Sequence, residues 1–507
     1  MPTQKHVVPT EVASLPEGQM KEVTLGETKV LLARVNGTLH AVAAACPHYG
    51  MPLAEGLLCG SMLRCAWHQS TFDITTGKLL EPPALDGLAT YPISVEDGQV
   101  IVTIPEAPTT PPAAPQAASD TRTFVILGAG AAGTAAAQAL RDLGFGGRVV
   151  LVTAERDQPY DRPNLSKEFL AGQIPADYLP LRPELFYTNA NITLLHQRAD
   201  AIDPAGRTIH FADGSTVTYD KLLLATGAEP RQLTVPGAEL ANVQTLRSRA
   251  DCDRLIAAAT SCGVHNVVVI GASFIGMEVA AALRERKLDV TVVTPDAVPF
   301  QRVLGPEVGG FFQRLHERHG VHFRLNARVD RLDGDHTVRQ VTLAAGEQLP
   351  AQLVVVGIGV RPATDLLPAQ WRDDRGAIPV DEFLRVRQAQ HVFAAGDIAR
   401  YPDPRGDGSL RIEHWRVAEQ QGRLAARNML RDAAEPFVAV PYFWSFQFGV
   451  GLDYVGHAGR WDRVQIDGNL AAADFTAYYV RDNRVIAASS CGRSRQMSAL
   501  LEIMKRD

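Results

Sequence analysis

The spacing of the hydrophobic positions changes twice along this chain of 507 residues. Residues 1–104 carry short apolar runs of β type, as at 30–35 and 100–104, separated by turn residues; this is typical of a small all-β module. From residue 122 onwards, short apolar strands run into glycine-rich turns and then into helical segments, the pattern of an α/β fold. After about residue 436 the sequence is aromatic and β-like, and a short helix is predicted at 497–504.

These changes predict a multidomain protein with an all-β module, two Rossmann-like α/β domains and a C-terminal α+β domain. Division into domains is also expected from length, because single cores stop growing at about 250–300 residues. The second α/β domain is predicted to be inserted into the first, which is therefore discontinuous. The predicted boundaries are 1–104 for the all-β module, 105–121 for a linker, 122–242 and 362–436 for the first α/β domain, 243–361 for the inserted domain and 437–507 for the C-terminal domain.

The predicted linker is rich in proline and alanine between residues 105 and 119. Such a composition cannot form a core and favours an extended polyproline II conformation. At about 3.1 Å per residue, it would reach roughly 45 Å. It is either an inert spacer or, as we favour, a tether that lets the all-β module dock and swing.

The first glycine-rich turn, Gly128-x-Gly130-x-x-Gly133, follows an apolar strand at 123–127 and opens a helix. Bare backbone at a helix N-terminus favours a pyrophosphate. Glu155 ends the next strand, 22 residues after Gly133, where a carboxylate can accept the hydroxyl groups of a ribose. The alternative for Glu155 is a solvated charge after a strand.

The second turn, Gly271-Ala-Ser273-Phe-Ile-Gly276, has serine in place of the central glycine. Sites for NAD usually carry an acid at the position of Thr294, where it would repel a 2′-phosphate. Asp296 is a possible substitute for that acid, whereas Arg302 is placed to accept a phosphate. We therefore favour NADH, and NADPH stays open.

Four candidate metal ligands lie in the all-β module: Cys46, His48, Cys65 and His68, with sixteen residues between the two pairs. The C-x-H…C-x-x-H pattern is that of a Rieske [2Fe–2S] cluster, in which two thiolates hold one iron and two imidazoles hold the other. A Cys2His2 set can also hold zinc, although zinc fingers usually group Cys with Cys and His with His. The absence of any metal is the third alternative.

Composition and charge exclude several classes of function. The net charge of −6 gives no basic footprint for nucleic acid, and no apolar run approaches the roughly 18–20 residues that span a bilayer. The N-terminus lacks the apolar core of a secretion signal, so a cytoplasmic location is expected. The six cysteines include no C-x-x-C pair, which leaves no obvious site for dithiol chemistry.

Residues 122–507 resemble the flavin-dependent reductases of the ferredoxin reductase, putidaredoxin reductase and apoptosis-inducing-factor group. With the predicted Rieske module in front, the whole chain is similar to the Rieske-containing apoptosis-inducing-factor-like proteins. The related disulfide reductases carry a redox cysteine pair in the first helix region, whereas residues 162–167 contain no cysteine. The segments that carry the resemblance are 155–167, 222–231, 354–362, 394–398, 413–422 and 442–449.

The resemblance implies FAD in the first α/β domain and NAD(P)H in the inserted one. Lys167 is expected beside flavin N5, where a cation stabilises the electron density that arrives with a hydride, and Glu278 is expected as its counter-ion. These two residues are the candidate catalytic residues. The resemblance assigns the second glycine-rich turn, with Gly271 and Gly276, to NAD(P)H. The other implied cofactor-binding residues are Gly128, Gly130, Gly133, Glu155, Arg162, Lys167, Ala225, Thr226, Gly227, Glu278, Gly359, Gly396, Asp397 and Trp415.

The resemblance also bears on the cluster. High-potential Rieske modules add a disulfide beside the ligands and donate serine and tyrosine hydroxyls to the sulfurs. Here Met51 and Trp67 lie near the ligands without such a disulfide, Ser70 is at the serine position, and Phe72 replaces the tyrosine. We therefore expect a reduction potential in the lower half of the roughly −150 to +300 mV Rieske range.

Two functions from different classes follow. In the first, an enzyme of ferredoxin reductase type passes electrons from NAD(P)H through FAD and the Rieske cluster to an external acceptor, which is a protein or a small molecule. In the second, an apoptosis-inducing-factor-like redox sensor changes its oligomeric state or its partners when NADH reduces it. We favour the enzyme, as a monomer or homodimer. A monooxygenase that acts on an organic substrate is disfavoured, because no substrate domain is visible.

Overall fold

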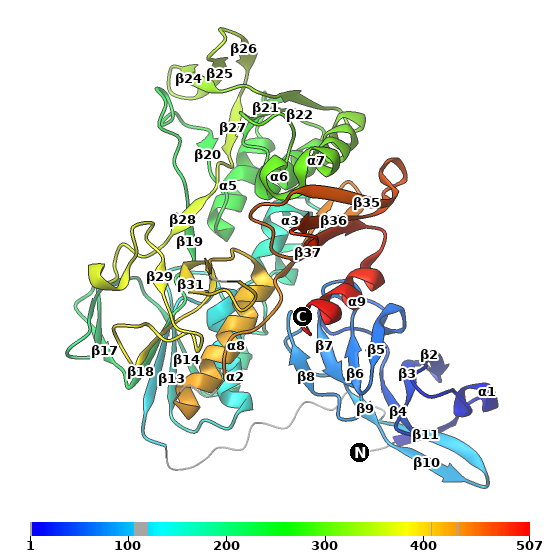
Figure 1. The fold of residues 1–507 in the computed structure, drawn as a ribbon. Coiled ribbons are helices and arrows are strands. Elements are labelled where there is room, and N and C mark those ends of the chain that lie inside the picture. Colours follow the sequence, from blue (N-terminus) through cyan, green and yellow to red (C-terminus); the bar gives the residue numbers. More distant parts are fainter. Residues whose placement is uncertain (1–2, 106–119, 407, 433–434, 507) are drawn as a thin grey trace. The chain divides into compact units, whose positions relative to one another are not determined.

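The computed structural model describes residues 3–105, 120–406, 408–432 and 435–506. The chain forms two compact units, one made of Met1–Pro115 with Arg493–Asp507 and the other of Gln116–Gly492; Figure 1 labels their elements. The predicted linker at 105–121 lies almost wholly outside the described residues, so its role as tether or spacer stays a prediction.

The N-terminal part of the first unit is all-β, as the sequence predicts, and its strands pair antiparallel. Two short helices, α1 (Thr10–Ala13) and η1 (Leu53–Glu55), accompany the strands. Within the described residues the sheets, in spatial order, are β1 (Thr3–Val7), β11 (Gln99–Pro105) and β10 (Ile93–Glu96); β2 (Met20–Leu25), β3 (Thr28–Val35), β4 (Thr38–Ala43) and β9 (Thr90–Tyr91); and β5 (Leu57–Cys59), β6 (Met62–Arg64), β7 (Thr71–Asp73) and β8 (Leu79–Glu81).

Strand β3 supplies two separate cores of this module. Val30 and Leu32 pack into one apolar cluster, whereas Leu31 and Ala33 pack into another. Successive side chains of a strand point to opposite faces, so a continuous apolar run can feed both. The second cluster includes the candidate ligands Cys46 and Cys65, so the candidate cluster site is anchored in a packed core.

The last helix of the chain, α9 (Ser494–Met504), belongs to this first unit. It lies beside β5 (Figure 1). Met497, Leu501 and Met504 are buried, and their spacing of four and three residues places them on one helix face. The sequence predicts this helix as part of the C-terminal domain 437–507, and its contacts group it with the all-β module; the domain boundary stays a prediction.

The second unit begins with the first α/β domain, built on a parallel sheet. Its last strand follows the inserted domain in sequence, so the domain is discontinuous, as predicted. The order of the sheet is β14 (Ile192–His196), β13 (Arg148–Thr153), β12 (Thr123–Leu127), β18 (Lys221–Leu224) and β30 (Val392–Ala394). A small antiparallel sheet of β15 (Ala199–Asp203), β16 (Thr208–Phe211) and β17 (Thr216–Thr218) and the helices α3 (Glu168–Ala171) and α4 (Leu185–Asn189) complete it.

Two helices of this domain, α2 (Ala131–Asp142) and α8 (Trp415–Arg431), lie side by side (Figure 1). Helix α2 is alanine-rich and nearly every one of its residues is buried. A Cβ on Gly422 of α8 would overlap the carbonyl oxygen of Ala132. The small residues therefore let the two backbones approach closely, which fixes the N-terminus of α2 beside Gly422 of α8.

The inserted α/β domain repeats the same plan. Helix α5 (Arg249–Ala259) begins at a capping box in which Ser248 and Asp251 satisfy each other's backbone N–H groups. Helix α7 (Gln301–Arg318) is broken at Gly305, whose φ is 77°, just before Pro306. Around α6 (Phe274–Glu285) the strands are β20 (Val243–Gln244), β27 (Leu353–Val356), β21 (Asn266–Ile270), β22 (Asp289–Val293) and β23 (Val321–Arg324), all parallel, with β24 (Val329–Gly334), β25 (Val338–Leu343) and β26 (Gln348–Pro350) antiparallel.

The C-terminal sheet packs on the inserted domain through an apolar core shared with α6 and α7. In this core the rings of Phe311 and Phe475 are 5.4 Å apart, centroid to centroid. The sheet is antiparallel, in the order β33 (Tyr442–Gln447), β34 (Val450–Gly456), β37 (Arg484–Cys491), β36 (Asp474–Arg481) and β35 (Arg463–Asn469).

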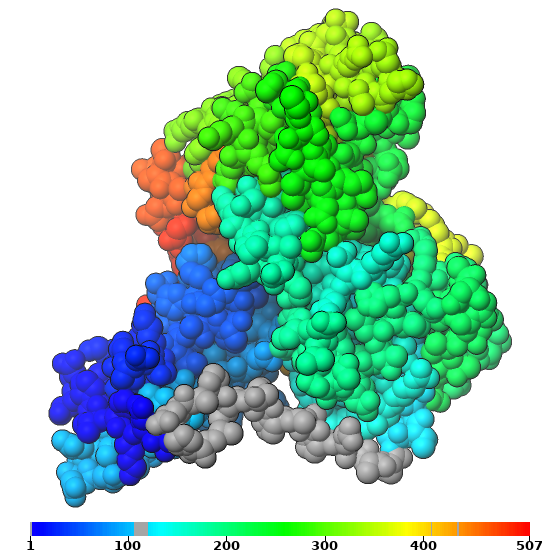
Figure 2. Space-filling view, turned by 180° about the vertical axis from the view of Figure 1, so that it is seen from behind, coloured from blue at the N-terminus to red at the C-terminus, as the bar shows by residue number. Residues whose placement is uncertain are grey.

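Short strands connect the two α/β domains, which form adjoining lobes of the surface in Figure 2. Strand β19 (Ala228–Pro230) leaves the first domain and pairs antiparallel with β28 (Val360–Pro362), which returns from the inserted one. The strands β29 (Ile378–Pro379), β31 (Ala399–Pro402) and β32 (Ser409–Leu410) follow. Among the described helices none is long and apolar enough to cross a membrane.

Candidate functional site

A cavity of about 910 Å³ lies within the second unit and is lined by both α/β domains. Its volume is at the upper end of the range for small-molecule sites. Gly133, Gly271 and Gly276 are not among the lining residues. The sequence-predicted site residues that line it are Gly128, Gly130, Glu155, Arg162, Lys167, Ala225, Thr226, Gly227, Glu278, Gly359, Gly396, Asp397 and Trp415.

The first glycine-rich turn forms a cradle at the N-terminus of α2. Gly128 has a φ of 112°, and a Cβ there would overlap the carbonyl oxygen of Ala225. A Cβ on Gly133 would overlap the carbonyl oxygen of Gly128, whereas Gly130 faces open space. The turn thus combines tight packing with a bare surface and the positive end of a twelve-residue helix, which fits a pyrophosphate.

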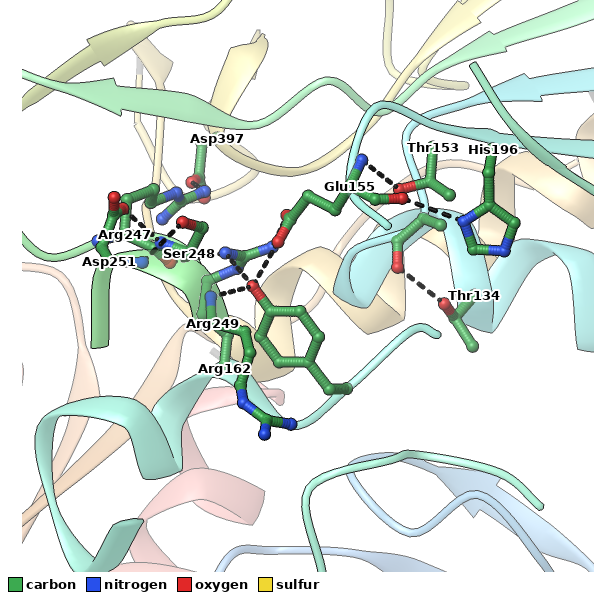
Figure 3. Close-up of polar contacts among 12 residues, drawn as sticks. Thr134, Thr153, Glu155, Arg162, His196, Arg247, Ser248, Arg249, Asp251 and Asp397 are labelled. Carbon is green, nitrogen blue, oxygen red and sulfur yellow. Dashed lines mark hydrogen bonds and ion pairs between the residues drawn. The ribbon is translucent and has the colours of Figure 1, made fainter. Parts of the chain in front are cut away.

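Glu155 is held at the adjacent strand end by two side chains (Figure 3). Arg162, on the helix η2 (Arg162–Ser166), donates from Nη2 to Glu155 Oε1 at 2.7 Å, and Tyr160 donates from its hydroxyl to Oε2 at 2.5 Å. The Tyr160 oxygen in turn accepts the backbone N–H of Arg249 at 2.9 Å. Burial raises the pKa of Tyr160, so its hydroxyl remains a donor at neutral pH. A carboxylate has four lone-pair sites, so Glu155 keeps capacity for a ribose.

Lys167 and Glu278 form a buried ion pair where the two α/β domains meet. Lys167 Nζ is 2.9 Å from Glu278 Oε2, and their side chains are 10% and 3% exposed. Two serine hydroxyls also donate hydrogen bonds to the Glu278 carboxylate: Ser166 donates to Oε2 at 2.5 Å, and Ser445 of β33 donates to Oε1 at 2.7 Å. A buried ion pair is tolerated only when such hydrogen bonds satisfy it.

The other side of the cavity is formed by Asp397, on the helix η5 (Gly396–Ile398), and by the start of α8. Asp397 Oδ2 is 3.1 Å from Arg247 Nη2 (Figure 3). Trp415 donates from its side chain to Glu419 one turn along the helix. The N–H of Gly396 donates to Gln421 Oε1 at 2.8 Å, so α8 fixes this turn from behind.

The Ala225–Gly227 turn is pinned across the cavity. The hydroxyl of Thr226 donates to the carbonyl of Ala363 at 2.6 Å, and Gly227 has a φ of 73°. Gly359, at the end of the inserted domain, accepts the backbone N–H of Arg231 at 2.9 Å. Both turns thus contribute backbone rather than side chains to the cavity wall.

The second glycine-rich turn has nearly the same backbone as the first. Gly271 has a φ of 109°, and a Cβ on it would overlap the carbonyl oxygen of Gly357, as one on Gly276 would overlap that of Gly271. The ribose position differs, because the buried Thr294 accepts the N–H of Asp296 at 3.3 Å. The Asp296 carboxylate is 3.5 Å from Arg302 Nη2, so an acid and a base both stand at this position.

The candidate cluster ligands lie in two similar loops of the all-β module. In the first, the N–H of Cys46 donates to the carbonyl of Met51 and that of Gly50 to Cys46, both at 2.8 Å. In the second, the N–H of Cys65 donates to Ser70 at 2.9 Å and that of Gln69 to Cys65 at 3.2 Å. Gly50 and Gln69 take the same left-handed conformation, with φ of 73° and 66°. Glutamine therefore occupies a backbone position that favours glycine.

The four donors form two pairs. His48 Nδ1 and His68 Nδ1 are 3.1 Å apart, and the thiols of Cys46 and Cys65 are hydrogen-bonded to each other. Burial lowers the pKa of His48 to about 3, which keeps the imidazole neutral as a ligand must be. No group of three or more His, Cys, Asp or Glu gathers at a single-ion site among the described residues. Two cysteines beside two histidines fit a two-iron cluster better than one zinc ion.

Comparison with known proteins agrees with this geometry. Residues 122–422 match the family described as pyridine nucleotide-disulphide oxidoreductase. The chain belongs to this family. Residues 5–92 match the Rieske [2Fe–2S] domain and residues 442–507 the reductase C-terminal domain. The protein is therefore an FAD-dependent NAD(P)H oxidoreductase that carries a Rieske [2Fe–2S] cluster.

Individual relatives cover most of the chain. Apoptosis-inducing factor 3 of Homo sapiens is 38% identical over 97% of this chain and 83% of its own. Rhodocoxin reductase of Rhodococcus erythropolis is 36% identical over 75% of this chain and 89% of its own. In the crystal structure of the covalent putidaredoxin reductase–putidaredoxin complex, the matched chain has a TM-score of 0.73 and 32% identity, over 76% of this chain and 94% of that one.

Several residues at the site were not predicted from the sequence. Ser445 reaches Glu278 from a segment 167 residues away, and no local pattern marks it. Tyr160 and Ser166 lie inside a motif that carried the family resemblance, so their position in that motif was the available signal. Gln421, whose side chain holds the Gly396 turn, lies one residue before Gly422 in another such motif.

Proposed function

We propose that this oxidoreductase takes its electrons from NADH and delivers them, through its own Rieske cluster, to an external iron–sulfur protein of ferredoxin type. The observation that carries the proposal is the presence in one chain of a dinucleotide cavity with a buried Lys167–Glu278 pair and of a separate four-donor cluster site. When bound, FAD accepts a hydride as two electrons and the cluster carries one electron at a time. The chain thus has sites for both groups that are needed to pass electrons from a two-electron donor to a one-electron acceptor.

We assign the residue roles as follows. The first glycine-rich turn and Glu155 bind the FAD diphosphate and ribose, and Asp397 holds the region between them and the ring. Lys167 presents a cation to the flavin, and Glu278, Ser166 and Ser445 keep that cation oriented and charge-balanced in a site with little water. Such preorganised charge acts without reorganisation at the moment of transfer.

The residues that remain direct the nicotinamide. Gly271 and Gly276 let the second turn approach the NADH diphosphate, and Gly359 lines the passage between the two domains. Trp415 bounds the flavin end of the cavity and excludes water from it. NADH is favoured over NADPH because Asp296 occupies Arg302, which would otherwise be available to a 2′-phosphate.

An external ferredoxin is favoured as acceptor because the relatives include ferredoxin reductase components of oxygenase systems, among them that of an anthranilate 1,2-dioxygenase system of Burkholderia cepacia. The structural relative is trapped with putidaredoxin, its named partner. A cytoplasmic location and a monomer or homodimer complete the proposal.

The test is anaerobic rapid mixing of the purified protein with one equivalent of NADH. Flavin absorbance should fall first, and the electron paramagnetic resonance signal of the reduced cluster should then appear. Adding an oxidised ferredoxin should return the cluster signal to zero. A cluster that stays oxidised while the flavin is fully reduced would refute the relay.

A second function is supported by the match to apoptosis-inducing factor 3, which spans nearly the whole chain. In this alternative the NADH-reduced state is a long-lived signal rather than a turnover state. Size-exclusion chromatography with and without NADH separates the two functions. A reduced protein that changes its oligomeric state and reoxidises slowly with ferredoxin would favour the sensor.

A further inference from the structure

An ion-pair network joins the C-terminal helix α9 to the strand that ends just before a candidate cluster ligand. Arg64, the last residue of β6, has a fully buried side chain, and it pairs with Glu502 of α9 and, at 3.6 Å, with Glu81 of β8. Lys505, just after α9, closes the network with 2.5 Å to Glu81 and 3.1 Å to Glu502. Two cations thus face two carboxylates, and the buried arginine has one partner in the module, Glu81, and one on α9, Glu502.

This network reaches the cluster loop directly. Arg64 precedes Cys65, and its Nη1 donates to the carbonyl oxygen of Gln69 at 3.3 Å. Gln69 holds the left-handed conformation that closes the loop just after His68, a conformation that is strained for a residue other than glycine. Arg64 therefore supports the strained turn next to this ligand, and Glu502 supports Arg64.

Helix α9 has the pattern of a docked helix. Met497 and Leu501 are fully buried and Met504 nearly so, whereas Ile503 is 55% exposed. Glu502 directly follows the buried Leu501, so it lies on the same helix turn, at the edge of the buried face. The buried apolar side chains and the charged residue beside them together fix the position of the helix on the module.

Chain connectivity gives this interface its consequence. Strand β37 ends at Cys491 and α9 begins at Ser494, so at most about 10 Å of extended chain separates the two elements. The other connection between the units, residues 106–119, has by its length alone a reach of roughly 45 Å. While α9 stays docked, the short connection between β37 and α9 is therefore the shorter of the two covalent links between the reductase unit and the Rieske module.

We propose that α9 is an intramolecular docking helix that keeps the Rieske module on the short tie and so speeds electron transfer from the flavin to the cluster within one molecule. The inference rests on the proposed function, because it concerns the step between the two redox centres. NADH delivers two electrons as a hydride; they leave one at a time through the single cluster to the ferredoxin, and the proton passes to solvent. Releasing α9 leaves only the long tie.

The test compares the full-length Glu502→Gln/Lys505→Gln variant with the wild type in anaerobic rapid mixing with NADH. The double variant removes one charge of each sign and leaves Arg64 paired with Glu81, so the module stays balanced. Flavin reduction should be unchanged, whereas cluster reduction should slow at least tenfold. In both proteins its rate should be independent of protein concentration, because a covalent tie remains. Iron content and the g-values of the reduced cluster check that the module is intact.

Two further variants define the outcome. Arg495→Gln changes an exposed charge on the same helix and should behave as the wild type. Leu501→Asp disrupts the apolar face and should slow cluster reduction more than the double variant. If Leu501→Asp retains both chromophores and reduces its cluster at the wild-type, concentration-independent rate, the docking role is overturned. A wild-type cluster that NADH never reduces would instead refute the proposed function, so the two failures are distinguishable.

Discussion

The two glycine-rich turns of the reductase unit share a backbone and differ in their side chains. Gly128 and Gly271 have φ values of 112° and 109°, and each packs against a carbonyl oxygen of a crossing turn. The first turn continues with a bare Gly130 and is completed by an anchored Glu155, whereas the second has Ser273 and the uncharged Thr294. The two turns therefore share a backbone fold, but the side chains at the position where a ribose is expected differ in charge.

We propose that this difference separates a resident cofactor from an exchangeable one. Glu155 is fixed by Tyr160 and Arg162 through hydrogen bonds of 2.5 and 2.7 Å, so its site is preorganised and the ordering cost of binding is already met. Around Thr294 the one acid, Asp296, is partly engaged by an exposed arginine. Weaker preorganisation suits a substrate that must leave after every hydride transfer.

The largest effect is expected from matched alanine substitutions in the two turns. In Gly133→Ala the new Cβ meets the Gly128 carbonyl, and in Gly276→Ala it meets that of Gly271. We expect Gly133→Ala to be purified almost free of FAD and Gly276→Ala to keep FAD but lose reduction by NADH. The ratio of flavin to protein absorbance and anaerobic NADH titration measure the two results. Loss of FAD from both variants to the same extent would contradict the division of labour.

A smaller effect, on the rate of flavin reduction, is expected from substitutions at the buried Lys167–Glu278 ion pair between the two α/β domains. Lys167→Met removes the cation and leaves Glu278 buried, so flavin reduction by NADH should slow by about 10²–10³-fold with little change in KM. Ser445→Ala removes one hydrogen bond to the same carboxylate but leaves the cation in place, so it should slow reduction less than Lys167→Met does. Stopped-flow reduction at saturating NADH measures both. Equal losses in the two variants would mean that Lys167 acts only through packing.

The sequence predicted the parts of this comparison that local pattern determines. Gly128 and Gly271 are recognisable because a tight turn before a helix excludes side chains, and Lys167 and Glu278 were paired from the family resemblance and lie 2.9 Å apart. Ser445 and the network around Arg64 could not be predicted, because contacts across the chain depend on tertiary packing. The apolar spacing around Leu501 in the sequence predicts that one face of α9 is buried. It does not indicate which module covers that face.

A further prediction sharpens the comparison at the second ribose site. Asp296→Asn frees Arg302, whose side chain is 80% exposed, to attract a 2′-phosphate. The ratio of kcat/KM for NADPH to that for NADH should rise by up to about fivefold, since an exposed ion pair is worth roughly 0.2–1 kcal/mol. Steady-state kinetics with both nucleotides measures it. The double variant Asp296→Asn/Arg302→Gln should return the ratio to that of the wild type; a ratio that stays high would assign the effect to another residue.

The smallest expected effect concerns the other buried glutamate, Glu419 on α8, and contrasts it with Glu278. Both side chains are buried, but Glu278 has a lysine and two serines, whereas Glu419 Oε2 has no hydrogen-bond partner among the described residues. Burial, reinforced by Asp161, raises the pKa of Glu419 well above its ordinary value of 4.5. In the unfolded chain the group ionises near that ordinary value, so the fold loses stability as pH rises above it.

Glutamine at this position is the uncharged form at every pH. The free energy of unfolding of Glu419→Gln should therefore match that of the wild type near pH 4.5 and exceed it by about 1 kcal/mol or more at pH 8, because an unsatisfied buried charge is removed. Denaturant unfolding of the FAD-loaded proteins at the two pH values measures the difference. Glu278→Gln is the matched comparison, and there the sign reverses, since it leaves the buried Lys167 without its counter-ion. Parallel pH profiles for wild type and Glu419→Gln would show that Glu419 stays ionised in the fold and that α8 tolerates the charge.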